Sequence, residues 1–242
     1  MQPRFYARRP HFSAVSLLLT LFLFLPRLSA QTDLRVPAKA LPQDQTAAIE
    51  SIMEAGRKLE SEERWTDAFT HFDDASREYP DSQKLRLRRT LAHIHVDLAR
   101  RAADSSFVNF QDTSTRQEAL GTFQEICLKV QSHYVHEPDW QRLTWRGTAS
   151  LDVAITKPEF QRRFVPKITS DQVTAFRHLL RNTVNKRAVT SRSESRDLVA
   201  YTSRLAKEHL GIPENVTIGE YCAGAVASLD QYSTFLTPDQ LD

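Results

Sequence analysis

Two histidine pairs are the residues whose spacing comes closest to supporting metal chemistry. His93 and His95 are two residues apart, and on a helix their side chains point about 200° from each other, so they cannot share one ion. His133 and His136 are three residues apart, can share a helical face, and have Glu137 beside them. No third ligand follows at a suitable spacing, and surface histidines are the commoner explanation. We therefore predict no metal site.

The two cysteines leave two interpretations open. Cys127 and Cys222 both lie in apolar patterns with helical spacing, which is typical of buried free thiols. In an exported protein they could instead form a disulfide. The spacing alone does not decide between a bridge and two thiols, because the distance between the residues in the fold is unknown.

The sequence contains no local motif that indicates a catalytic serine. The chain contains no G-x-S-x-G elbow, no glycine-rich phosphate loop and no H-E-x-x-H helix. Ser228 lies in a helical pattern and Ser233 follows Tyr232 in a turn, and neither has a lysine close in sequence to act as a base. We interpret both serines as structural, and we predict no catalytic and no cofactor-binding residue in this chain.

The elements that would position these side chains are helices. The chain has only 6 glycines in 242 residues, which argues against a fold rich in hairpins, and apolar residues recur at spacings of three and four. We predict an all-α fold, with a helical hairpin first and a bundle-like helical region after it. The expected helices cover residues 44–61, 64–79, 82–103, 116–137, 139–155, 170–186, 193–211 and 218–229, with linkers at 31–43 and 105–115 and a short turn between Pro158 and Pro166.

Residues 1–30 have the layout of a secretory signal peptide. Three early arginines precede the largely apolar run Ala14–Leu25, and the small residues Ser29 and Ala30 precede a possible cleavage point. The run is short for a membrane span, although an uncleaved segment could still act as an anchor, which would be the protein's only membrane contact. We expect an exported protein, periplasmic or secreted.

The leader also accounts for the basic charge of the chain. Residues 1–30 hold four arginines and no acidic residue, so removing them changes the formal net charge from +2 to −2. A protein without excess positive charge has no electrostatic attraction for a polyanion. We therefore expect no nucleic-acid partner.

The stretch 44–104 resembles a tetratricopeptide repeat followed by one more helix. Small, aromatic and proline residues fall at that repeat's positions, namely Gly56, Leu59, Ala68, Phe72, Ala75 and Pro80. Small residues at Gly56 and Ala68 let two antiparallel helices approach closely, and Pro80 ends the second helix. One repeat cannot bury its own faces, so the third helix is expected to cap it, and an ordinary helical hairpin remains an equal interpretation.

Two segments of the region 116–242 resemble the carboxyl-terminal processing, or tail-specific, serine proteases. The first is 123–139, "FQEICLKVQSHYVHEPD", a helix that leads into Tyr-Val and an acidic-proline turn. The second is 224–241, "GAVASLDQYSTFLTPDQL". Its matching positions are Leu229, Asp230, Tyr232, Ser233, Phe235, Leu236 and Pro238. The connection between the two is longer than the family's usual one, so residues 153–216 resemble an insertion.

The resemblance implies a peptidase whose working parts would follow this region. In that family a PDZ domain captures the tail of a protein substrate, and a serine with a lysine base then cleaves it. The present sequence contains neither part, and Thr237–Gln240 has the pattern of a helix start with only two residues after it. We therefore expect a truncated, inactive N-terminal portion that packages, dimerises or presents substrates, with protein or peptide partners bound through the missing domains. The alternative is a free-standing exported helical module that binds a protein or peptide.

Overall fold

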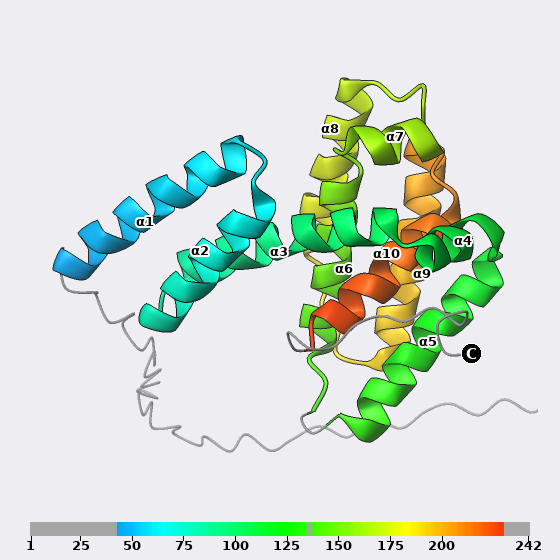
Figure 1. Ribbon diagram of the computed structural model, residues 1–242. Helices are drawn as coiled ribbons and strands as arrows, with labels where there is room; N and C mark the ends of the chain where they lie inside the picture. The colour runs from blue at the N-terminus through cyan, green and yellow to red at the C-terminus, as the bar shows by residue number, and fades with distance from the viewer. Residues whose placement is uncertain (1–42, 135–136, 230–242) are drawn as a thin grey trace, which may run out of the picture. The chain divides into compact units, whose positions relative to one another are not determined.

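The computed structural model describes residues 43–134 and 137–229 and contains only helices within them, which confirms the all-α prediction (Figure 1). The signal segment, the first linker and the last thirteen residues lie outside this part of the chain. The helices are α1 Gln43–Ser61, α2 Trp65–Glu78, α3 Gln83–Ala103, α4 Ser105–Thr113, α5 Arg116–His133, α6 Trp140–Ala154, α7 Pro158–Phe164, α8 Ser170–Leu179, the π-helix η1 Leu180–Val184, α9 Arg192–Leu210 and α10 Glu214–Ala227.

Local sequence sets several helix ends. The Thr115 side chain accepts from the amide of Glu118, whose carboxylate accepts from the Thr115 amide, and Thr169 and Gln172 repeat this capping box at α8. Gly211 ends α9 with φ of 77°, a left-handed conformation that side chains disfavour. The helix ends with these caps lie within one residue of the expected positions, whereas the last helix, expected at 218–229, is α10 at Glu214–Ala227 and begins four residues earlier.

The first three helices share a small hydrophobic core. Phe72, Ala68 and Leu85 are fully buried there, and α3 packs along α2. A Cβ atom at Gly56 would lie 2.1 Å from the Phe72 ring, so only glycine lets α1 lie this close to α2. Helices α1 and α2 thus approach closely at Gly56, and α3 covers α2.

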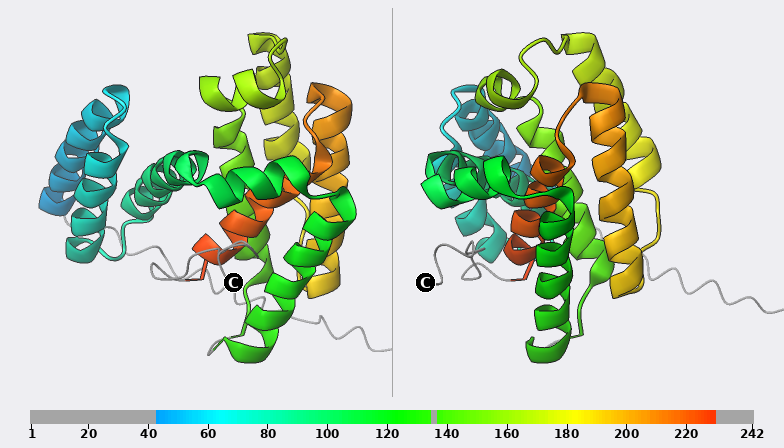
Figure 2. Two further views of the ribbon diagram at one scale, coloured as in Figure 1. Left: turned by 45° about the vertical axis from the view of Figure 1, so that its right-hand side comes forward. Right: turned by 90° about the vertical axis from the view of Figure 1, so that its right-hand side faces the viewer.

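The remaining helices bury a second, larger core around α10. This helix packs against α5, α6 and α9, and Figure 2 shows it passing between them. A Cβ atom at Gly224 would lie 2.6 Å from the Cα of Gly147, so two glycines let the backbones of α10 and α6 nearly touch. The crossing brings Tyr221 into the core, where its hydroxyl pairs with that of Thr148 at 2.7 Å.

Three sequence expectations need correction or refinement. The stretch 105–115, expected to be a linker, forms helix α4 and buries Phe107 and Phe110, whose spacing was too short to stand out as a helical pattern. The turn after Pro158 is helix α7. The stretch 153–216, which resembled an insertion, contributes side chains such as Phe176 and Val199 to the same core as α5, α6 and α10, so it is integral to the packing.

Within the described residues, no helix is both long and apolar enough to cross a bilayer.

Candidate binding site beside helix α3

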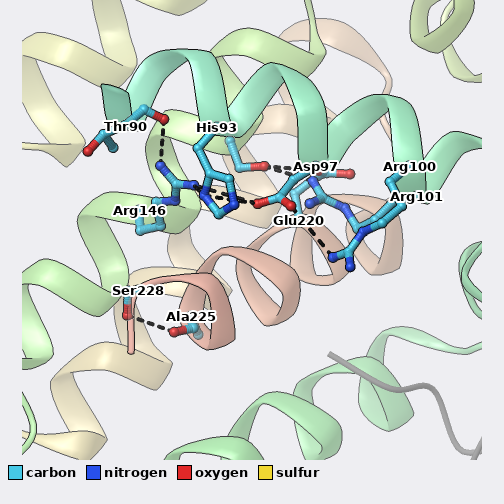
Figure 3. Close-up of polar contacts among 10 residues, drawn as sticks. Thr90, His93, Asp97, Arg100, Arg101, Arg146, Glu220, Ala225 and Ser228 are labelled. Atoms are coloured by element: carbon cyan, nitrogen blue, oxygen red, sulfur yellow. Dashed lines mark hydrogen bonds and ion pairs between the residues drawn. The ribbon is translucent and has the colours of Figure 1, made fainter. Parts of the chain in front are cut away.

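Helix α3 carries polar side chains into two buried contacts with the helices that follow it. Its buried residues include Asp97 and Arg101 beside the apolar Leu85, Ala92 and Ile94. Asp97 and Arg101 are both buried, and each faces a partner of opposite charge. These contacts connect the N-terminal helices to the larger core (Figure 3).

The first contact is a buried ion pair between α3 and α10. The Arg101 Nη2 donates to the Glu220 Oε2 at 2.8 Å and to the Ser150 Oγ at 3.0 Å, and Ser150 also donates to Glu220. The amide of Gln111 reaches the other carboxylate oxygen at 3.4 Å. Both charged side chains are at least nine-tenths buried, so each depends on the other for compensation.

The second contact joins α3 to α6. Arg146 donates to the Thr90 carbonyl oxygen and to the His93 Nδ1, both at 2.8 Å, and lies 3.6 Å from Asp97. Burial lowers the pKa of Arg146 to about 10, against the opposing effect of Asp97, and burial also lowers the pKa of His93. Because a guanidinium only donates, the His93 Nδ1 accepts and the imidazole is neutral in this arrangement.

A cavity of about 440 Å³, here called the α3 cavity, opens beside the Arg101 pair. It is lined by Glu63, Trp65, His95, Leu98, Ala99, Arg101, Ala102, Phe107, Gln111, Ala154, Lys157, Glu159, Phe160, Arg163, Phe164 and Glu220. The volume and the mostly apolar lining with a few polar groups are those of small-molecule sites in proteins.

Three buried polar atoms of side chains that line the α3 cavity have no hydrogen-bond partner among the described residues. They are the Trp65 Nε1, the His95 Nδ1 and the Arg101 Nε. The Trp65 and His95 rings stack at 3.4 Å, and the Lys157 ammonium lies 5.2 Å from the Trp65 ring centre. Burial lowers the pKa of His95 to about 3, and the Lys157 charge acts in the same direction. His95 is therefore neutral at physiological pH.

A smaller cavity of about 240 Å³ lies on another side of α3. It is lined by Phe69, Asp73, Arg89, Thr90, His93, Arg142, Trp145, Arg146, Ala227 and Ser228. His93 and His95 thus line different cavities, as their helical spacing predicts, and no cluster of three potential metal ligands occurs in the described residues.

The other residues considered for chemistry are not brought together. Ser228 donates to the Ala225 carbonyl oxygen at 2.7 Å, and its hydroxyl contacts no basic side chain among residues 43–134 and 137–229. His133 contacts the Ser132 hydroxyl on the surface. Cys127 and Cys222 are buried free thiols, and burial raises the pKa of both, that of Cys127 to about 12. Raised pKa values keep both buried thiols protonated at neutral pH.

Some candidates fall outside the described residues, namely His136, Ser233 and the matching positions 230–238 of the second family-like segment. The α3 cavity was not anticipated, because its walls come from six separate segments. One sequence feature pointed to part of this site. Glu220 is an isolated charge in the otherwise apolar run "VTIGEYCAGAVA", and a buried charge requires a partner.

Comparison with known proteins finds no matching family model, no matching curated protein and no matching solved structure.

Proposed function

We propose that this chain is the non-catalytic helical portion of an exported serine-type endopeptidase similar to the carboxyl-terminal processing proteases. One contact carries the proposal. The Tyr134 hydroxyl donates to the Leu229 carbonyl oxygen at 3.0 Å, and these residues belong to the two separate segments that resemble that family. If two segments contact each other in the fold of a family, the sequence patterns of both are expected to occur in the same chain. The contact between Tyr134 and Leu229 therefore supports the resemblance to these proteases.

The packing around that contact adds to this support. Helix α5, which carries the first segment, packs along α10, which leads into the second, and both bury residues in one core. Phe123 and Cys127 of α5 and Cys222 of α10 are all fully buried there. A rigid α5–α10 pair would hold the exit of α10 in a fixed direction, which suits a scaffold for domains that follow it.

The chemistry of the described residues favours a scaffold over an enzyme. A serine nucleophile needs a base at about 2.6–3.2 Å, and the hydroxyl of Ser228 is instead bonded to a main-chain carbonyl oxygen. The role proposed for this portion is to package or dimerise the peptidase and to present protein or peptide substrates to it.

Labelling with a fluorophosphonate, which reacts with activated serines, tests the non-catalytic part of the proposal. We expect the full chain to remain unlabelled and to cleave no unstructured peptide, while a serine protease labelled in parallel serves as the control. Stoichiometric labelling of a serine in this chain would overturn it.

A free-standing module that binds a protein or peptide is the second candidate. It is favoured by the α1–α3 core, in which Gly56 and Phe72 interlock and α3 closes the hairpin. This candidate requires the chain to be stable without further domains. Urea unfolding of the full chain, followed by near-ultraviolet circular dichroism, should then show one cooperative transition, and a gradual loss of signal would count against it.

A further inference from the structure

We propose that a groove beside Arg142 binds an extended acidic segment of a protein partner. The carboxylates of the segment contact Arg89, Arg142 and Lys186, and one of its apolar side chains packs against an indole ring of the groove. This inference does not rest on the proposed function, because it uses only the shape and the charge of one surface.

Two hollows beside α6 form this groove, here called the Arg142 groove, and Arg142 and Trp145 line both of them. The first is the cavity of about 240 Å³ beside α3 described above, and the second is an open hollow lined by residues 185–188. Because the two shared side chains are three residues apart on α6, they lie on one face of that helix, and the hollows adjoin there. A depression extended in this way suits a stretch of peptide better than a compact small molecule.

The groove carries an excess of positive charge. Its described lining contains five basic and two acidic side chains, namely Arg89, Arg142, Arg146, Lys186 and Arg187 against Asp73 and Asp139. Asp73 already accepts hydrogen bonds from Arg77 and Arg89. Asp139 accepts from the main-chain amide of Arg142 at 2.8 Å, as the N-cap of α6. Carboxylates of a ligand would therefore meet basic groups that the groove's own acids leave unmatched.

Four of the basic groups can be reached from solvent. Arg142, Lys186 and Arg187 are exposed, and 39% of the Arg89 side chain is exposed. The side chains of Arg142 and Lys186 make no hydrogen bond and no ion pair with residues 43–134 and 137–229. The Arg187 guanidinium lies over the Tyr201 ring, 3.8 Å from its centre, and contacts no carboxylate in the same part of the chain.

The fifth basic group, Arg146, lies beneath this surface. Its side chain is 5% exposed and donates to Thr90 and His93, and Asp97 is 3.6 Å away (Figure 3). Because Asp97 offsets its charge, Arg146 is not one of the proposed contacts.

Two aromatic side chains give the groove its apolar part. Trp145 and Phe69 are half-buried, so part of each ring is open to a ligand. Aromatic surface next to cationic groups fits an apolar side chain that is flanked by carboxylates.

The charge of the rest of the chain favours a short acidic segment over a long polyanion. Residues 1–30 hold four arginines and no acidic residue, so residues 31–242 carry a formal net charge of −2, against +2 for the full chain. The excess of positive charge in the groove is therefore local, and a polyanion that extends beyond the groove meets no net attraction.

Titration of the full chain with an acidic peptide, followed by NMR of the three tryptophan indole N–H groups, tests the proposal. The peptide alternates glutamate with glycine on both sides of one phenylalanine. The Trp145 signal is identified by its loss in Trp145→Phe. We expect it to shift saturably with a Kd of about 100 μM or tighter, while the signals of Trp65 and Trp140 move less. No saturable shift would overturn the proposal, whatever the result of the fluorophosphonate labelling.

Matched comparisons test the role of charge. The same peptide with glutamine in place of every glutamate should bind roughly tenfold more weakly. Arg142→Gln and Lys186→Gln should each weaken binding of the acidic peptide by roughly fivefold. Arg162→Gln, which removes an exposed charge of α7 outside the groove, should not. Equal binding of the two peptides, or equal binding by Arg142→Gln and Arg162→Gln, would overturn the assignment of carboxylates to this groove.

Two other occupants would give different results. A single-stranded oligothymidylate should bind roughly tenfold more weakly than the peptide, and equal affinity would overturn the peptide assignment in favour of a general polyanion site. Residues 230–242 carry three aspartates and no basic residue. Their removal should leave the Kd unchanged. Binding of the peptide only after this removal would overturn the proposal in favour of the chain's own acidic segment.

Discussion

The Tyr134 hydroxyl donates a hydrogen bond to the Leu229 carbonyl oxygen, 3.0 Å away and 95 residues further along the chain. The bond closes the end of α5 onto the end of α10. Removing it with Tyr134→Phe leaves a partly buried carbonyl without this donor, so we expect a loss of about 1 kcal/mol of unfolding free energy. Urea unfolding measures this. Tyr201→Phe is the matched control, because the Tyr201 ring contacts Arg187 and no hydrogen bond of its hydroxyl occurs in the described residues, and it should change stability by less than about 0.5 kcal/mol. Equal effects of the two substitutions would contradict a structural role for this bond.

Substitution of Gly56 tests the α1–α2 contact. A Cβ atom there would meet the Phe72 ring at 2.1 Å, so Gly56→Ala must push the helices apart and should cost about 1–3 kcal/mol of stability. Gly121→Ala is the control at an exposed position of helix α5, where no atom lies within 4 Å and alanine should stabilise by about 0.5–1 kcal/mol. Thermal or urea unfolding of both variants should therefore give opposite signs. If both substitutions destabilised the protein to a similar extent, the loss at position 56 would not be due to a steric clash with Phe72.

The buried Arg101–Glu220 pair should dominate the stability of the α3–α10 contact. Glu220→Ala leaves the Arg101 guanidinium buried with only Ser150 as a partner, and we expect a loss of about 3–5 kcal/mol in unfolding free energy. The comparison is Glu125→Ala, which removes the exposed 4.0 Å pair with Lys129 and should cost less than about 1 kcal/mol. Stability losses of similar size for the two substitutions would show that the buried pair contributes no more to stability than an exposed pair.

The depressed pKa of His95 predicts a pH dependence of stability. The folded protein holds this imidazole neutral down to a pKa of about 3, whereas the unfolded chain binds a proton near pH 6.5. Between these values the unfolded state carries more protons, so stability falls as the pH decreases below about 6.5, by at most about 1.4 kcal/mol per unit. His95→Phe keeps an aromatic ring against Trp65 and removes the titration.

Unfolding free energies of the unaltered chain and His95→Phe, measured between pH 7 and pH 4.5, check this. The difference between the two proteins should grow as the pH falls, in favour of the variant. Parallel curves would mean that folding leaves the pKa of His95 unchanged, which would contradict the prediction.

Local spacing was enough to predict the longer helices and the close approach at Gly56. The spacing of Gly56 and Phe72 indicates two helices packed closely against each other, as the structure has them. The Gly211-Ile212-Pro213 sequence ends α9 with the expected left-handed glycine. Both features depend on residues near each other in sequence, where helical periodicity is informative.

The site depends on contacts that periodicity does not reveal. Arg101 and Glu220 are 119 residues apart, and the same spacing rules that place them on helices say nothing about which helices meet. Helix α4 was missed because nine residues with two aromatics and many polar groups resemble a loop. The near contact of Gly147 and Gly224 likewise depends on which faces of α6 and α10 cross.

The proposed place of this chain in a larger peptidase is tested most directly by reading the source organism's coding DNA through and beyond the codon for Asp242. We expect a reading frame, continuous or restored by a single-base shift, that extends into a PDZ-like segment followed by a serine and a lysine of a catalytic domain. A verified stop after Asp242 with no such sequence downstream would contradict it and would leave the free-standing binding module.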